Sequence, residues 1–208
     1  MKIIRNVVFD LGNVLLKYDP KGFLESLGYD PIKVQDLTQL IFRSQEWRAA
    51  DQGLLGKEEH TKIYLQKAPH YAKEIEYVMD HWVEMPTLLE DSSKIFLDIV
   101  EQGYQVYLLS NYPEQGFMEM WENTPLLHLA HGSVISYQLK LIKPMPEIYR
   151  HLLDKYGLNP EETLFLDDLA ENIEGAKALG IHGIVFKNTQ QVIQELRDYG
   201  IHIKKEGN

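Results

Sequence analysis

The stretch Val7-Val8-Phe9-Asp10-Leu11-Gly12-Asn13-Val14-Leu15 decides the fold class, because an apolar run ends abruptly at one carboxylate and a Gly-Asn turn. Residues 3–10 predict a buried parallel strand, since this run is short, continuous and rich in β-branched residues. In open α/β sheets, functional groups lie at the carboxyl ends of the parallel strands. Asp10 is therefore predicted to be a nucleophile or a metal ligand, although an Asp here can also simply cap a turn.

Two further apolar runs end in polar side chains. Residues 105–110 predict a second strand, which ends on Ser110 and Asn111. Residues 163–167 predict a third strand, which ends on the pair Asp167-Asp168, and Lys143-Pro144 lies between these two runs.

The rest of the chain divides into an all-helical part and an alternating part. From Pro20 to about Leu89 the apolar residues recur at helical spacing, and no convincing strand is present. From Leu88 onward, helix and strand patterns alternate, which predicts parallel βαβ units. The further elements expected are helices over 92–102, 115–122, 146–156, 172–179 and 192–199, and strands over 134–137 and 183–186. The expected fold class is α/β: a Rossmann-like parallel sheet core (1–16 and 88–208) with an α-helical insertion after the first strand (17–87).

Composition and charge limit the class of partner. The chain has 208 residues, 44% of them hydrophobic and 25% charged, as in an ordinary globular protein. It has no cysteine, which excludes a thiol nucleophile and a cysteine metal site and fits a reducing cytoplasm. No segment approaches about 18 continuous apolar residues, so no membrane span is expected. The net charge of −10 argues against a nucleic-acid partner but permits a small phosphorylated metabolite. Oligomeric state cannot be read from the sequence.

Asp10, Ser110, Lys143-Pro144 and Asp167-Asp168, in this order, resemble the four motifs of the haloacid dehalogenase superfamily of phosphohydrolases. The resemblance spans about residues 5–187 and implies that the helical insertion is a cap over the active site. It also implies that Asp10 attacks phosphorus and forms an aspartyl-phosphate, with Lys143 as the second catalytic residue.

The same resemblance implies a Mg²⁺ site and a phosphate site. Asp10, the Gly12 carbonyl and Asp168 would be the metal ligands, and Asp167 aligns with a position that more often acts through water. The residues expected to bind the phosphoryl group are Ser110, Asn111, Asn13 and Lys143. Two further residues are expected to support the site: Asn172 by fixing its loop, and Asp19 as a surrogate acid or, alternatively, as a turn residue before Pro20.

Gly12 departs from the family pattern, in which a second Asp two residues after the nucleophile protonates the leaving group. Three explanations remain open. The first is a phosphatase whose substrate needs little acid assistance or whose acid comes from elsewhere; the form Asp-Leu-Gly-Asn-Val resembles bacterial enzymes that act on α-D-glucose-1-phosphate and related sugar phosphates. The second is a hydrolase similar to the 2-haloacid dehalogenases, since halide leaves without a proton. The third is a phospho-ligand-binding module with weakened catalysis.

Two features of the helical insertion bear on the substrate. The segment Gln45-Glu46-Trp47…Asp51-Gln52-Gly53 resembles a cap segment of sugar-phosphate enzymes. Trp47 and Trp82 are expected to belong to the core of the insertion rather than to stack on a substrate.

Overall fold

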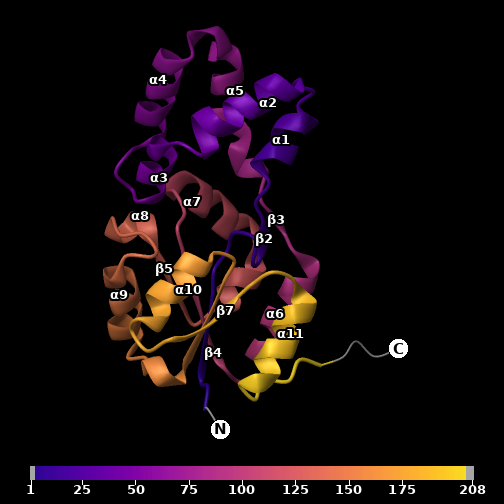
Figure 1. Ribbon diagram of the computed structural model, residues 1–208, viewed down its shortest axis with the longest axis vertical. Helices are drawn as coiled ribbons and strands as arrows, with labels where there is room; N and C mark the ends of the chain where they lie inside the picture. Colours follow the sequence, from indigo (N-terminus) through magenta and orange to yellow (C-terminus); the bar gives the residue numbers. More distant parts are fainter. Residues whose placement is uncertain (1–2, 205–208) are drawn as a thin grey trace.

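The computed structural model describes residues 3–204 and has a five-stranded parallel sheet at its centre, with the strand order β5-β4-β1-β6-β7 (Figure 1). The strands are β1 (Asn6–Phe9), β4 (Gln105–Ser110), β5 (Gly132–Ile135), β6 (Thr163–Asp167) and β7 (His182–Val185). The prediction of an α/β fold with a Rossmann-like parallel sheet is therefore confirmed.

Strand β1 occupies the middle of the sheet, and its register aligns the strand ends that matter. Phe9 pairs with Leu108 of β4 and with Leu166 of β6. The backbone N–H of Asp10 then donates to the Leu166 carbonyl at 2.9 Å. Asp10 consequently emerges between the carboxyl ends of β4 and β6, where the strand order changes direction and ligands bind in such sheets.

Helices cover both faces of the sheet, so alternate residues of each strand enter two different cores. Val7 and Phe9 lie in one hydrophobic cluster with side chains from α6 and α11, whereas Val8 lies in a second cluster with side chains from α9 and α10. This arrangement explains why the strands read as continuous apolar runs. The helices of this part are α6 (Glu90–Glu101), α7 (Glu114–Asn123), α8 (Ser136–Leu139), α9 (Pro146–Tyr156), α10 (Ala170–Lys177) and α11 (Thr189–Asp198).

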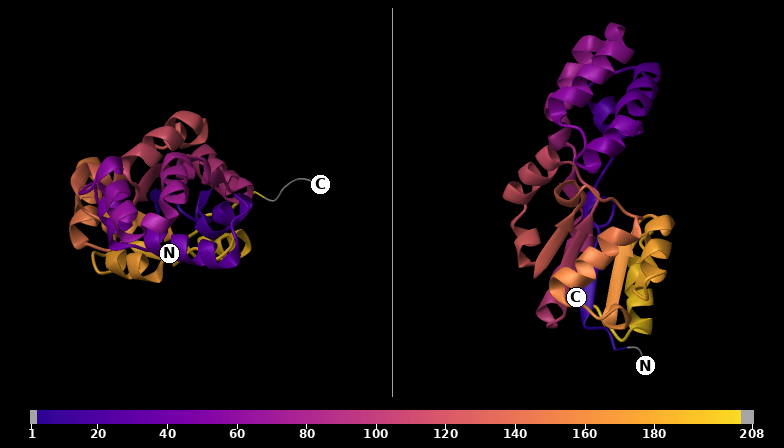
Figure 2. Two further views of the ribbon diagram at one scale, coloured as in Figure 1. Left: turned by 90° about the horizontal axis from the view of Figure 1, so that it is seen from above. Right: turned by 90° about the vertical axis from the view of Figure 1, so that its left-hand side faces the viewer.

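Five α-helices within residues 20–81 form a separate group above the carboxyl ends of the strands (Figures 1 and 2). They are α1 (Pro20–Ser26), α2 (Pro31–Leu37), α3 (Gln45–Asp51), α4 (Lys57–Lys67) and α5 (Ala72–His81), with short 3₁₀ or π turns between or after them over 38–42, 69–71 and 82–84. We call residues 17–87 the helical insertion.

Two local predictions differ from the structure. Residues 134–137 were expected to be a strand, but β5 ends at Ile135 and the chain continues as the short helix α8, in which the Ser136 hydroxyl accepts the Tyr112 N–H at 2.9 Å. The helical part was expected to contain no strand, yet β2 (Leu16–Lys17) and β3 (Thr87–Leu88) form a two-stranded antiparallel sheet where the chain enters and leaves the insertion. Among the described residues, no helix has the length and apolar character needed to cross a membrane.

Candidate active site

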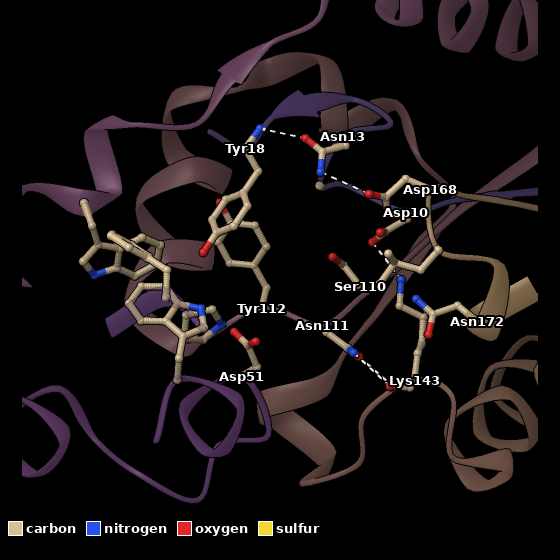
Figure 3. Close-up of a pocket in the computed structure, with 16 residues that line it drawn as sticks. Asp10, Asn13, Tyr18, Asp51, Ser110, Asn111, Tyr112, Lys143, Asp168 and Asn172 are labelled. Carbon is tan, nitrogen blue, oxygen red and sulfur yellow. Dashed lines mark hydrogen bonds and ion pairs between the residues drawn. The ribbon is translucent and has the colours of Figure 1, made fainter. Parts of the chain in front are cut away.

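Asp10 projects from the end of β1 into a cavity of about 310 Å³ beneath the helical insertion (Figure 3). The chain reverses directly after Asp10, because the Leu15 and Leu16 N–H groups both return to the Leu11 carbonyl, at 2.9 and 2.8 Å. Asn13 adopts a φ of 52° in this turn, a left-handed conformation that Asn tolerates better than most residues. The tight turn keeps Gly12 and Asn13 at the cavity wall beside Asp10.

Lys143 is the central buried charge of the site. Its Nζ donates to Asp167 Oδ2 at 2.6 Å and to the Leu109 carbonyl at 3.0 Å, and it forms an ion pair with Asp10 Oδ1 at 2.8 Å. Burial would lower the pKa of Lys143, but the neighbouring Asp10 and Asp167 carboxylates outweigh it, and the pKa stands above its usual value. Lys143 is therefore a fixed ammonium at neutral pH.

Burial also controls the ionisation of Asp10. It raises the pKa of this carboxyl to about 6, against the opposing charge of Lys143, while the nearby Asp167 contributes to the increase. The Ser110 hydroxyl, almost fully buried at the end of β4, lowers the Asp10 pKa by hydrogen bonding to it. At neutral pH the group at the end of β1 is a carboxylate that is poorly solvated and held by few partners, which suits a nucleophile.

Asn111 fixes the backbone of Lys143. Its side-chain oxygen accepts the Lys143 N–H at 2.8 Å, and its side-chain nitrogen donates to the Lys143 carbonyl at 3.1 Å. The peptide bond that follows, Lys143-Pro144, is cis. Asn111 thus positions the lysine, while the residue itself lines the cavity beside Ser110.

The paired carboxylates at the end of β6 have different surroundings. Asp167 is fully buried: Oδ2 contacts Lys143, Oδ1 accepts the Leu169 N–H at 2.8 Å, and the Asn172 amide donates to both oxygens, at 2.9 and 3.0 Å. Asp168 instead lines the cavity, and burial raises the pKa of this carboxyl. Asn172, in the first turn of α10, thus holds Asp167 at the end of β6.

Three carboxylates are close enough to share a cation. One oxygen from each of Asp10, Asp167 and Asp168 lies within 4.8 Å of the other two. Both Asp167 oxygens are engaged and Asp167 does not line the cavity, so Asp10 and Asp168, which do line it, are the carboxylates placed to bind an ion, with Gly12 next to them. This set of hard oxygen donors, with space for water, fits Mg²⁺.

Two predicted site residues have other contacts. Asn13, expected at the phosphate, donates its side-chain amide to Asp168 Oδ2 at 3.1 Å and accepts the Tyr18 N–H at 3.2 Å, so it links the turn to the acidic pair. Asp19, expected as an acid or a turn residue, caps α1 by accepting the Gly22 N–H, and this bond lowers the pKa of Asp19. Asp19 is not among the residues that line the cavity.

The helical insertion supplies the opposite wall of the cavity, which is aromatic. Trp47 and Trp82 are buried, as expected for core residues, and pack edge to face at 4.8 Å, yet both also line the cavity together with Phe42. Each tryptophan therefore belongs both to the core of the insertion and to the cavity wall, because the core extends to the cavity surface.

Three polar residues on this side of the cavity were missed as site residues: Tyr18 and Asp51 of the helical insertion, and Tyr112 of the loop after β4 (Figure 3). Asp51 belongs to the segment that resembles sugar-phosphate caps, which was the available sequence signal. Tyr18 and Tyr112 had no signal, because tyrosines occur throughout the chain.

Comparison with known proteins agrees with this arrangement. The family model of the haloacid dehalogenase-like hydrolases matches residues 4–180 of the sequence. The chain belongs to this family and is a hydrolase of the haloacid dehalogenase type.

Two relatives that match over most of the chain are named as phosphatases of different substrates. The chain is 26% identical to a D-ribitol-5-phosphate phosphatase of Bacteroides thetaiotaomicron over 93% of this chain and 97% of that protein. It is 25% identical to a sesquiterpene phosphatase of Aspergillus oryzae over 91% of this chain and 93% of the relative.

Solved structures show the same fold. A haloacid dehalogenase family enzyme of Bacteroides thetaiotaomicron, crystallised with magnesium and inorganic phosphate, superposes with a TM-score of 0.68 at 22% identity, over 88% of this chain and 94% of that one. The L-2-haloacid dehalogenase of Xanthobacter autotrophicus superposes with a TM-score of 0.67 at 17% identity, over 94% and 83% of the chains. At these identities, the likeness defines the fold alone.

Proposed function

We propose that this protein is a Mg²⁺-dependent phosphomonoesterase that hydrolyses a small sugar or polyol phosphate through an aspartyl-phosphate on Asp10. One observation supports this most directly: the Asp10 carboxylate lies at the end of the central strand, 2.8 Å from the Lys143 ammonium, in a cavity that it shares with Asp168. The other residues of the site either position these groups or line the cavity above them.

Charge explains why these residues occur together. A phosphate monoester is a dianion, and two unit negative charges 4 Å apart repel by about 4 kcal/mol at an effective dielectric constant of 20. Lys143 offsets part of this repulsion at Asp10. When bound by Asp10, Asp168 and the Gly12 carbonyl, Mg²⁺ supplies the remaining positive charge and orients the phosphoryl group.

The residues of the chain then have distinct roles. Asp10 attacks phosphorus, and the Ser110 hydroxyl and Asn111 N–H bind the phosphoryl oxygens, since both residues line the cavity at the end of β4. Asp167 and Asn172 hold Lys143 and the start of α10 in place. Phosphoryl transfer depends mainly on such positioning and electrostatic stabilisation.

The helical insertion, residues 17–87, acts in this proposal as a cap that excludes water and selects the substrate. The cavity volume of about 310 Å³ is near the lower end of the range of about 300–1,000 Å³ found for ligand pockets, which favours a small metabolite. The relative that acts on D-ribitol-5-phosphate supports a phosphorylated polyol or sugar, such as α-D-glucose-1-phosphate.

Phosphate release from α-D-glucose-1-phosphate and D-ribitol-5-phosphate, measured with Mg²⁺ and with EDTA, tests the proposal. We expect EDTA-sensitive release that falls below about 10⁻³ of the wild-type rate in Asp10→Asn, because the amide cannot attack phosphorus. Equal release by Asp10→Asn would exclude Asp10 as nucleophile.

Two further measurements, chloride release and ligand binding, separate the two alternatives. Chloride release from a 2-haloacid, without phosphate release from any ester, would assign the protein to the dehalogenases, which share its fold and need no acid at position 12. Mg²⁺-dependent binding of a sugar phosphate without turnover would indicate a binding module.

A further inference from the structure

Gly12 leaves a chemical requirement unmet if the proposed phosphatase function is correct. An alkoxide leaving group needs a proton as the phosphorus–oxygen bond breaks, and a general acid contributes about 10²–10⁴-fold to such a step. Glycine cannot supply that proton. Among the cavity residues, Asp10, Lys143 and Asp168 already have roles in the attack, charge balance and metal site.

The remaining carboxyl of the cavity is Asp51, the last residue of helix α3 in the helical insertion. Figure 3 shows it on the aromatic side of the cavity below Tyr112, with Asp10, Lys143 and Asp168 on the other side. A leaving group attached to phosphorus at Asp10 would extend toward this wall. Within the described part of the chain, the Asp51 carboxyl makes no hydrogen bond or ion pair, so both its oxygens are available to a ligand.

Two further polar groups in the same wall also lack partners. The hydroxyls of Tyr18 and Tyr112 are buried, and neither has a hydrogen-bond partner among residues 3–204. Both residues line the cavity, and the Asp51 charge adds to the burial that raises the pKa of each tyrosine. Buried polar groups are rarely left unsatisfied, so this wall is built to receive a ligand that carries oxygen atoms.

The position of Asp51 is fixed by contacts with the core. The Ser136 hydroxyl of α8 donates to the Asp51 carbonyl and also accepts the Tyr112 N–H. One residue further, the Gln52 side chain donates to the Lys140 carbonyl at 2.8 Å. The end of α3 is therefore docked on the core rather than suspended above the cavity.

The surroundings of Asp51 favour its protonated form. Burial raises the pKa of its carboxyl well above the usual value, Arg48 of the same helix lowers it, and the Asp10 charge raises it further. The charged or titratable groups around Asp51 are Arg48, Asp10, Tyr18, Tyr64 and Tyr112. Only Arg48 opposes protonation, since the other groups are anionic or neutral.

We propose that Asp51, supplied by the helical insertion, is the general acid that protonates the leaving oxygen, in place of a carboxyl at position 12. As Asp10 bonds to phosphorus, the phosphorus–oxygen bond to the leaving group breaks, its electron pair stays on that oxygen, and the Asp51 proton transfers to it. The resulting Asp51 carboxylate then takes a proton from the water that hydrolyses the aspartyl-phosphate. The net reaction converts ester and water into alcohol and inorganic phosphate.

Asp51→Asn tests this assignment when two substrates of different leaving groups are compared. With a sugar or polyol phosphate we expect kcat/KM, which reports only the steps up to formation of the aspartyl-phosphate, to fall about 10²–10⁴-fold. With p-nitrophenyl phosphate, whose phenolate leaves without a proton, we expect kcat/KM to fall less than about tenfold, because the attack on phosphorus is unaltered and the later removal of a water proton does not enter kcat/KM. The decrease of kcat/KM toward high pH that reports the protonated acid should also disappear in the variant.

Position 12 provides a rescue variant. A Cβ built on Gly12 meets no atom within 4 Å, so Gly12→Asp adds a side chain at the cavity wall with no contact at its Cβ. We expect Gly12→Asp to restore hydrolysis of the sugar phosphate at least tenfold when combined with Asp51→Asn. Asp80→Asn, an exposed carboxyl of the same insertion outside the cavity, is the matched control.

The outcomes distinguish the acid from other roles and from failure of the proposed function. Equal losses of kcat/KM on both substrates, or a loss on the sugar phosphate that lies in KM with kcat unchanged, would overturn the general-acid role and leave a structural or binding role for Asp51. A wild-type enzyme that releases phosphate from neither substrate would overturn the proposed function itself. Wild-type activity that Asp51→Asn leaves intact would overturn only the inference.

Discussion

Lys143 shows at the scale of one residue how the site balances its charges. Its ammonium is buried with a side chain only 1% exposed, between two carboxylates at 2.8 and 2.6 Å. Such a group is costly to bury but more costly to remove, because its partners would remain as buried unpaired charges. The stability of the core and the chemistry of the site therefore depend on the same contacts.

Replacing this lysine should destabilise the whole protein. We expect Lys143→Met to lower the free energy of unfolding by about 3–5 kcal/mol and to abolish phosphate release, since Asp10 and Asp167 lose their shared counter-ion. Urea denaturation at pH 7 measures the first effect. Lys67→Met, which removes a partly exposed pair with Glu46 at 2.8 Å, should cost about 0–1 kcal/mol. Equal losses in the two variants would contradict the role given to burial.

Asp168 is the residue at which metal dependence should be most visible. We expect Asp168→Ala to raise the Mg²⁺ concentration for half-maximal phosphate release at least about tenfold, because one of two available carboxylate ligands is lost. A Mg²⁺ titration of activity provides the measurement, with Glu171→Gln, an exposed acid of the neighbouring helix α10, as control. An unchanged titration would remove Asp168 from the metal site.

Three of the site residues that the sequence identified lie at or directly after the ends of strands. Asp10, Ser110 and Asp168 sit at the ends of apolar runs, and parallel strands bring such ends together whatever the details of packing. Asp51 has no such local mark, because its burial depends on where α3 docks, and that position is set by Ser136 and Lys140 far along the chain. The hydrogen bond from Asn13 to Asp168 likewise joins residues far apart in the sequence, whereas the cap that Asp19 forms is a local contact before Pro20, as in the turn alternative.

Whole elements were likewise predicted where a local sequence pattern defines them and missed where long-range contacts do. Strands β1, β4 and β6 were predicted because buried parallel strands are continuous apolar runs. The pair β2–β3 was missed because each strand has two residues, and its only signal is the pairing of Leu16 with Leu88. The sequence extends strand β5 to Tyr137 because Val134 and Ile135 are β-branched. The chain instead turns into helix α8 at Ser136, whose hydroxyl bonds to Tyr112 and Asp51.

Contact between helix α3 and helix α8 can be tested at Gly53, which follows α3. Gly53 has a φ of 73°, and a Cβ there would collide with the Tyr137 carbonyl of α8. We expect Gly53→Ala to weaken this docking, lower the free energy of unfolding by about 1–3 kcal/mol through backbone strain and raise KM, since Asp51 and the aromatic wall move with α3.

Gly28→Ala separates strain from docking. Gly28 has a similar φ of 77°, but a Cβ there meets nothing within 4 Å. Both variants carry the same backbone penalty, so the difference between them reports the contact with Tyr137. If the two variants share the same KM, the docking of α3 does not control the cavity.

At the scale of the whole molecule, the packing of the helical insertion includes one buried histidine, His60, whose protonation should lower stability. His60 of α4 is 4% exposed, packs on Trp47 with ring centroids 6.2 Å apart, and has no partner for Nδ1 in the described part of the chain. Burial, assisted by the charge of Lys57, lowers the pKa of His60 to about 4. The insertion therefore contains a histidine that must stay neutral for its aromatic core, and with it one wall of the cavity, to remain packed.

This histidine should make the protein less stable in mild acid. Between the ordinary pKa of about 6.5 and the folded value, the unfolded chain binds more protons than the folded one, so stability falls as the pH falls. From pH 7 to pH 5 we expect wild type to lose about 1 kcal/mol more than His60→Gln, a figure reduced for partial solvent screening. Urea denaturation at the two pH values measures the difference, in which the other titrating groups cancel. Parallel losses in the two proteins would show that His60 accepts its proton without disturbing the insertion, and a larger loss in His60→Gln would place the acid-sensitive point elsewhere in the fold.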